Sequence, residues 1–309
     1  MALTFQKAIH RPSIFYRLTS FTIEEFSVLC VKIMPEWNKR EHERLASRPH
    51  RLRAIGQGRP YAGSFETRLL CALVYLGTAC GGALLAMLFN IDEVTMRSWR
   101  HSFLPLLQDR FIPNTVVSSA RKRINDLDEF LKIYPELKEL IADGVELKTQ
   151  RPKRKQAKNY TGKSKRHVKK IVVGINSDDG LFVSRTKIRP GSVHDKRVLD
   201  EDPLHKRLNN QQHLTKRADS AWTGEDEQRG WIVNKRGRRN HPLTEIEKKQ
   251  NKKLSKIRIK VEHAIRRMKI FRRLAETVVI RTKGGLDQVI NAAMNLANFK
   301  VLIRQSNQM

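Results

Sequence analysis

The sequence contains few acidic residues and few cysteines. Asp and Glu total 31 against 61 Lys and Arg, which gives a formal net charge of +30. A surplus of this size is unusual for an ordinary cytosolic enzyme and indicates a polyanionic partner. Nucleic acid is the first candidate and an anionic membrane surface is the second. Because acids are scarce, an acid within a basic stretch requires an explanation.

The three cysteines, Cys30, Cys71 and Cys80, form no Cys-x-x-Cys pair. Their odd number and their spacing argue against a disulfide framework and against a cysteine zinc site. The first residues lack the layout of a signal peptide. We therefore expect buried thiols in a reducing compartment, and a cytoplasmic protein associated with the nucleoid.

Residues 69–89 carry no charged side chain and are long enough to span a bilayer. Gly77, Gly81 and Gly82 interrupt this run. We therefore predict two buried helices joined by a glycine turn, with no membrane span.

Residues 82–100 have the spacing of a helix-turn-helix. Asn90 can adopt the left-handed conformation of the turn, and Met96 and Trp99 fall on the inner face of the second helix. The outer face carries Glu93 and three candidate DNA contacts, which are Thr95, Arg97 and Arg100. A helical hairpin without a DNA-binding role would have the same apolar spacing.

Several helix starts can be recognised from their capping residues. Thr22 and Thr244 are each followed three residues later by Glu, which predicts two capping boxes. Ser192 is a candidate N-cap, which would place Asp195 at the third helical position. We expect His194 to be a capping or packing residue.

The C-terminal part is predicted to contain strands at residues 137–148, 167–175, 214–219 and 231–233. Asp143 lies in the first strand and Asp219 ends the third. Asp178-Asp179-Gly180 is interpreted as a turn closing a hairpin. A long helix after Thr244 carries Glu262, and ion pairs with Arg258 and Arg266, four residues to either side, are the structural alternative for it.

The order Asp143, Asp219 and Glu262 suits metal-dependent phosphodiester cleavage. Two divalent ions about 4 Å apart can stabilise both the attacking and the leaving oxygen. Magnesium prefers hard carboxylate ligands, and acids on two strands and a helix could meet at one site. Spacing alone is a weak signal, because any long chain contains three acids in some order. Asp195 and Glu146 remain alternative ligands.

A set of ordered motifs gives the chain a resemblance to a known family. The motifs are Leu140-Ile141-x-Asp143-Gly144-x-Glu146, Tyr160-x-Gly162-Lys163-x-Lys165-Arg166-His167, Pro190-Gly191-Ser192-x-His194-Asp195, Ala218-Asp219, and Arg258-x-x-Val261-Glu262-His263. The chain resembles the DDE-type transposases of small bacterial insertion sequences, close to the Harbinger-like group. The resemblance covers most of the chain.

The resemblance implies an α+β protein. Residues 1–135 would be an all-α DNA-binding domain with the helix-turn-helix, and residues 136–309 would be an α/β ribonuclease H-like catalytic domain with a mixed sheet. Asp143, Asp219 and Glu262 would be catalytic and would bind Mg²⁺ or Mn²⁺. Double-stranded DNA, as element terminal inverted repeats and target, would be the partner of a homo-oligomer.

The basic side chains around the predicted site are candidates for DNA contact. They are Arg151, Lys153, Arg154, Lys163, Lys165, Arg166, Arg258 and Arg266. The predicted activity is cleavage of DNA strands and their transfer to a target. The alternatives are an inactive DNA-binding protein derived from a transposase, and a ribonuclease H-like nuclease.

Overall fold

The N-terminal third of the chain is helical. The computed structural model describes residues 2–48, 54–55, 57–58, 60–108, 132–209, 211, 213–218, 230–237, 241–280, 282 and 284–306. The helices of this third are α1 (Phe5–Ala8), α2 (Pro12–Thr19), α3 (Ile23–Ala46), α4 (Phe65–Gly77), α5 (Gly82–Phe89) and α6 (Glu93–Gln108).

The N-terminal helices begin and break where the capping residues and glycines predict. Thr22 and Glu25 form the capping box of α3. The apolar run at residues 69–89 is divided between α4 and α5, with Thr78 as the C-cap of α4. None of the helices in the described part of the chain is long and apolar enough to cross a membrane.

The remainder of the chain is mixed α and β. Its strands are β1 (Glu139–Lys148), β2 (Tyr160–Thr161), β3 (Arg166–Asn176), β4 (Phe182–Arg185), β5 (Arg189–Pro190), β6 (Thr215–Ala218) and β7 (Trp231–Val233). Its helices are α8 (Gln156–Asn159), α9 (Asp195–Asp200), α10 (Pro203–Asn209), α12 (Glu245–Lys269), α13 (Arg272–Ala275) and α14 (Gly285–Ser306).

Within the described ranges, seven strands form one mixed sheet with β1 at its centre. The order is β2-β3-β1-β6-β7, and β4 and β5 also pair with β3. β1 pairs with β3 antiparallel and with β6 parallel, and β6 pairs with β7 parallel. The pairing with β6 covers only residues 139–141 of β1, so β1 continues beyond the registered part of β6.

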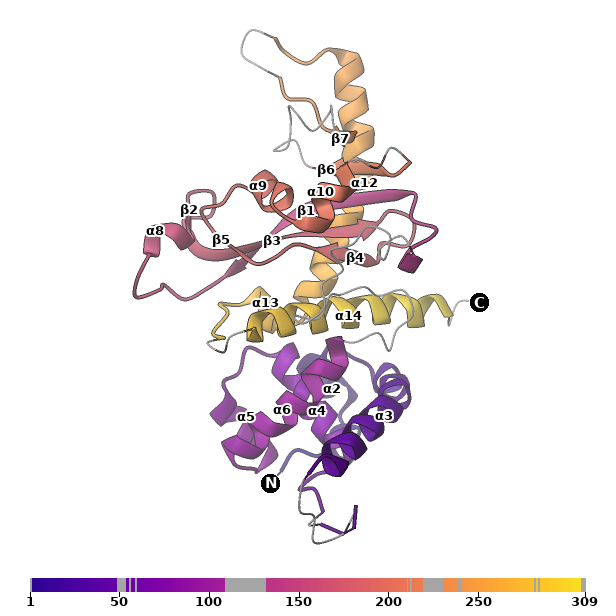
Figure 1. The fold of residues 1–309 in the computed structure, drawn as a ribbon, viewed down its shortest axis with the longest axis vertical. Helices are drawn as coiled ribbons and strands as arrows, with labels where there is room; N and C mark the ends of the chain where they lie inside the picture. The colour runs from indigo at the N-terminus through magenta and orange to yellow at the C-terminus, as the bar shows by residue number, and fades with distance from the viewer. Residues whose placement is uncertain are drawn as a thin grey trace.

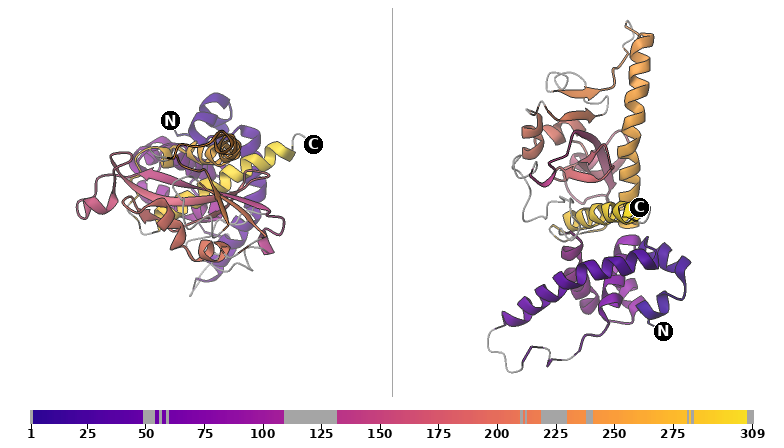
Figure 2. Two further views of the ribbon diagram at one scale, coloured as in Figure 1. Left: turned by 90° about the horizontal axis from the view of Figure 1, so that it is seen from above. Right: turned by 90° about the vertical axis from the view of Figure 1, so that its right-hand side faces the viewer.

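Helices cover both faces of this sheet (Figure 1, Figure 2). Ile141 and Val145 of β1 share a core with Val261 and Ala264 of α12. Leu140 and the other even-numbered core residues of β1 pack with α9, α10, β6 and β7. The sheet therefore presents the odd-numbered residues of β1 to α12 and the even-numbered ones to α9.

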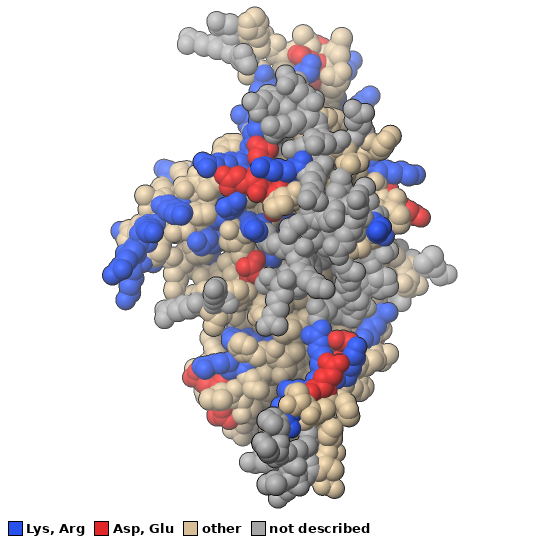
Figure 3. All heavy atoms as spheres, in the orientation of Figure 1, with Lys and Arg blue, Asp and Glu red and all other residues tan. Residues whose placement is uncertain are grey.

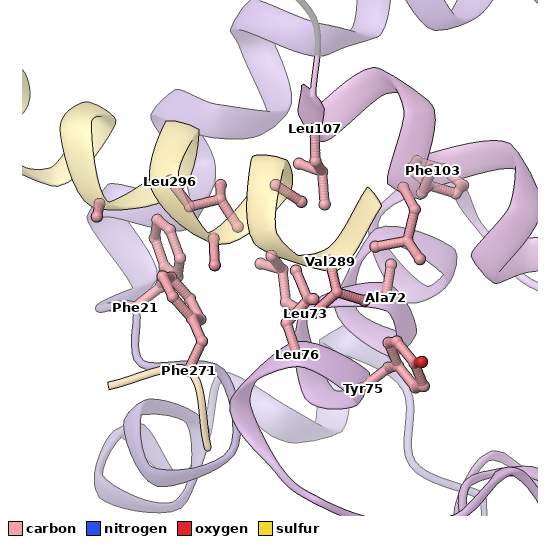
Figure 4. Packing of buried hydrophobic residues seen from close by; sticks show 14 of the residues in the cluster. Phe21, Ala72, Leu73, Tyr75, Leu76, Phe103, Leu107, Phe271, Val289 and Leu296 are labelled. Atoms are coloured by element: carbon pink, nitrogen blue, oxygen red, sulfur yellow. The ribbon is translucent and has the colours of Figure 1, made fainter. Parts of the chain in front are cut away.

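Helix α14 lies between the sheet and the N-terminal helices (Figure 1). Figure 4 shows Val289 of α14 beside Leu73 and Leu76 of α4, and all three belong to one buried cluster. Asn298 of α14 also accepts a hydrogen bond from the buried Phe182 amide of β4 at 2.8 Å. One continuous core thus joins the two parts, whose division into residues 1–135 and 136–309 remains a prediction.

A buried ion pair links α14 to the start of α3. Lys300 Nζ donates to Glu25 Oε2 at 2.6 Å and also to the Ser20 carbonyl. Both side chains are at least nine-tenths buried. Burial lowers the pKa of Lys300, while the Glu25 carboxylate opposes that shift.

Replacing Lys300 with Met should destabilise the protein, because the buried Glu25 would lose its nearest cation and would keep the more distant Arg304 guanidinium, 3.6 Å from its Oε1. The free energy of unfolding should fall by about 3–5 kcal/mol, as measured by urea denaturation. Arg272→Met, which breaks the exposed pair with Glu276, is the control and should cost less than about 1 kcal/mol. Equal losses in the two variants would contradict this account.

Candidate active site

Asp143 lies near the middle of β1, on the face that α12 covers. Its neighbours on that face, Ile141 and Val145, are buried, while Asp143 is half-buried. Its Oδ1 accepts a hydrogen bond from the Gly144 amide at 2.7 Å. The predicted strand is confirmed, and its alternation directs the Asp143 carboxylate toward the α12 side.

Glu262 lies on α12, which begins at the predicted Thr244 capping box. The preceding residue, Val261, is fully buried, whereas Glu262 is exposed. Its carboxylate forms no hydrogen bond or ion pair with any residue that the structure describes. The alternative ion pairs with Arg258 and Arg266, both described, are therefore not formed. α12 packs on β1, so Glu262 and Asp143 come from two elements in contact.

Asp219 lies outside the described residues. β6 ends at the buried Ala218, the residue before it. In the parallel pairing of β6 with β1, the last registered pair is Ile141 with Arg217. The strand that the sequence predicts before Asp219 is thus present next to β1.

Lys269 of α12 interacts electrostatically with Asp143, which no pattern in the sequence indicates. Burial lowers its pKa, and the charge of Lys148 lowers it further, whereas the carboxylates of Glu146 and Asp143 act in the opposite direction. Lys269 follows Glu262 by seven residues, which is about two helical turns and hence the same side of α12. The positive charge of Lys269 therefore interacts with the Asp143 carboxylate.

The alternative ligands Glu146 and Asp195 lie together on the opposite face of β1. Lys170 bridges them, with its Nζ 3.6 Å from Glu146 Oε1 and 3.2 Å from Asp195 Oδ1. Glu146 pairs with Lys170 in the β1–β3 register, which explains their contact. In the described residues no group of three Asp, Glu, His or Cys side chains is arranged to hold a metal ion.

The expected cap of α9 was wrong by two residues. His194, not Ser192, is the N-cap, and its Nδ1 accepts from the Lys196 amide at 3.3 Å. Asp195 is consequently the first residue of α9 rather than the third. Ser192 instead donates its hydroxyl to the Lys158 carbonyl at 2.9 Å, and this contact with the segment before β2 outweighs the capping preference.

The motif that begins at Tyr160 and the motif that begins at Pro190 lie side by side. Residues 160–163 of the first and residues 191–195 of the second line one cavity of about 530 Å³, together with Lys170. The two segments can lie this close because residue 191 is a glycine: a Cβ at this position would lie 2.6 Å from the Asn159 carbonyl oxygen. The motifs thus form one structural unit although about 30 residues separate them in the sequence.

Most of the predicted DNA contacts of the C-terminal part are exposed cations. Arg151, Lys153, Arg154, Lys163, Lys165 and Arg166 lie around α8 and β2. Figure 3 shows Lys and Arg gathered on this projecting arm. Near Glu262, Arg266 is exposed and Arg258 is half-buried.

The three predicted DNA contacts of α6 differ in whether their side chains already contact another residue. Arg97 is exposed. The Thr95 hydroxyl donates to Asp92 Oδ2 at 2.7 Å, and the Arg100 guanidinium lies 5.0 Å from the centre of the Tyr75 ring. Asn90 has φ 53°, the predicted left-handed turn between α5 and α6, and Met96 and Trp99 are buried as predicted.

Gly144→Ala should disturb the Asp195 side of β1. An added Cβ would lie 2.8 Å from Asp195 Oδ2, so the carboxylate that pairs with Lys170 must shift. We expect a loss of about 1–3 kcal/mol in the free energy of unfolding, measured by urea denaturation. Gly162→Ala is the control, because nothing lies within 4 Å of its Cβ. An unchanged stability for Gly144→Ala would show that this contact is not tight.

A match to a known protein family covers β6, α12 and most of β1. No curated protein matches the chain. A comparison with protein families matches residues 142–298 to the family described as DDE superfamily endonuclease. The match begins one residue before Asp143, includes Asp219 and Glu262, and spans just over half of the chain. The chain therefore belongs to the DDE superfamily endonucleases.

Proposed function

We propose that the chain is a DNA transposase in which Asp143, Asp219 and Glu262 form one active site. The observation that carries this proposal is the placement of Asp143 on the α12 face of β1, with Glu262 exposed on α12. The last registered pair of β1 and β6 is Ile141 with Arg217, and two residues further along each chain are Asp143 and Asp219. Asp143 and Glu262 therefore belong to two elements in contact, and Asp219, outside the described residues, directly follows the third element, β6.

The order of the sheet supports a ribonuclease H-like catalytic domain. Three antiparallel strands, β4, β3 and β1, are followed by the parallel strands β6 and β7, and then by α12. This order sets β1 and β6 side by side at the centre. Acids on these strands and on the helix covering them can converge without being close in the sequence.

The donor set fits a hard divalent cation. The described acids offer carboxylate oxygens, and the exposed Glu262 carboxylate is not bonded to any described residue. Asp143, Asp219 and Glu262 would hold Mg²⁺ or Mn²⁺, which stabilises the attacking and leaving oxygens of phosphodiester cleavage. Lys269 reduces the repulsion between these like charges, and the exposed cations around α8 and β2 orient the DNA backbone.

The N-terminal helices supply recognition in this proposal. α5, the turn at Asn90 and α6 form a helix-turn-helix, with the exposed Arg97 reaching the DNA. Thr95 and Arg100 would have to leave Asp92 and Tyr75 to make base contacts. The element ends would be read by residues 1–135, and a homo-oligomer would hold two ends together.

Cleavage should be mapped on a plasmid that carries this gene with its native flanks. In Mg²⁺ or Mn²⁺ we expect breaks at two inverted positions beside the gene. Asp143→Asn and Asp219→Asn should each lower the cleavage rate by at least about 100-fold through loss of a metal ligand, with DNA binding retained. Asp178→Asn, in the β3–β4 turn, is the matched control and should cleave normally.

The alternatives give different outcomes in the same experiment. Tight binding to the flanks without cutting by the wild-type protein would indicate an inactive DNA-binding descendant. Random nicking, or a preference for RNA–DNA hybrids over duplex ends, would indicate a ribonuclease H-like nuclease. Loss of folding in Asp219→Asn would make that residue structural.

A further inference from the structure

Helix α12 has three sides with different surroundings. Val261, Ala264 and Met268 face the core. Glu262 and Lys269 lie on a second side, where Asn251 and Ser255 also lie. At about 100° per residue, the remaining side lies about 120° from each of these two. It carries five exposed lysines, called here the lysine face: Lys248, Lys249, Lys252, Lys253 and Lys256.

The lysine face is on a projecting and well-braced part of the helix. Figures 1 and 2 show the N-terminal part of α12 rising past β7. Asn251 exchanges two hydrogen bonds with the backbone of Lys235, each 2.9 Å long. Asn234 donates to Ser255 Oγ at 3.1 Å. These bonds hold the helix on its second side and leave the lysine face toward solvent.

The charge of this face is hardly compensated. Among the described residues, Lys248 is the member with an ion pair, to Glu245 at 2.7 Å. The other four lysines extend over about two turns, or about 10 Å of helix axis. These four lysines are exposed and form no ion pair with any acid in the described part of the chain.

We propose that the lysine face binds the backbone of target DNA, a second duplex distinct from the one held at the catalytic acids. The proposal rests on the function proposed above. At about 100° per residue, Lys249, Lys253 and Lys256 point about 120–180° away from Glu262 around the axis and Lys252 about 80°. All four lie at least about 9 Å from Glu262 along the axis, so they face away from the phosphates beside the bond that is cut. They contact a different duplex segment.

The residue types indicate target DNA rather than an element end. Lysine is a flexible point charge that contacts phosphates without reading bases. The bidentate readers Arg, Asn and Gln do not occur on this side of residues 245–260. A surface that ignores sequence fits a target of varied sequence, whereas element ends require base contacts.

The test compares two quadruple variants of the full-length protein. One carries Lys249→Gln, Lys252→Gln, Lys253→Gln and Lys256→Gln. The other removes four exposed lysines elsewhere, with Lys32→Gln, Lys39→Gln, Lys187→Gln and Lys206→Gln. Binding to a duplex of unrelated sequence is followed by fluorescence anisotropy at several salt concentrations. Cleavage at the ends, and joining of precut ends to a target plasmid, are measured separately.

For the lysine-face variant we expect at least tenfold weaker binding to unrelated duplex. The slope of log affinity against log salt should become shallower by up to about 3.6, since each lost phosphate contact removes about 0.9. Joining should fall at least tenfold while end cleavage stays within twofold of wild type. The control variant should bind, cut and join like wild type.

Wild-type binding and joining in a folded lysine-face variant would overturn the proposal, as would an equal loss of cleavage and joining. An equal effect in the control variant would show a general charge effect and would also overturn it. If the wild-type protein cuts nothing, the transposase function fails. The anisotropy measurement still shows whether the lysine face binds duplex DNA.

Discussion

The alternation of side chains along β1 is the constraint on which the rest of the structure depends. Successive residues point to opposite faces, so Asp143 faces α12 while Gly144 lies beneath Asp195 of α9. Both faces are covered by helices, and the buried Ile141 and Leu140 fix the register. A slip of one residue would place an acid in a core and expose an apolar side chain. The packing of the strand thereby determines on which side the first acid is available.

Several buried cations show that part of the basic surplus maintains the fold. Arg185 is buried and donates to Asn291 Oδ1 at 2.6 Å and Asp287 Oδ1 at 2.8 Å, tying β4 to α14. Arg273 donates to the Tyr75 carbonyl at 3.0 Å and so links α13 to α4. These cations belong to the interior. In the proposed function, the exposed cations of the arm around α8 and β2 and of the lysine face would contact DNA.

Local features of the fold could be predicted from the sequence, because they depend on neighbouring residues. The Thr22 and Thr244 capping boxes, the strand containing Asp143 and the left-handed turn at Asn90 are of this kind. The Glu25–Lys300 pair and the position of Lys269 depend on residues distant in the sequence, and no periodicity reveals them. The α9 cap was mispredicted because a contact with Lys158, 34 residues away, engages Ser192.

The candidate site, too, could be predicted only in part from the sequence. The sequence identifies Asp143 and Glu262 as candidate catalytic acids, and the family match spans both. Only the fold distinguishes the α12 face of Asp143 from the opposite face, where Glu146 and Asp195 share Lys170. Asp219 remains a prediction from its place after β6.

The central claim is that three acids from three elements share one metal site. The most direct test is Mn²⁺ titration of the wild-type protein by calorimetry, beside Asp143→Asn, Asp219→Asn, Glu262→Gln and, as the control, Glu146→Gln. The account predicts that each of the first three variants weakens Mn²⁺ binding at least about tenfold, and that Glu146→Gln binds like wild type. Normal binding by the first three variants, or the largest loss in Glu146→Gln, would contradict it.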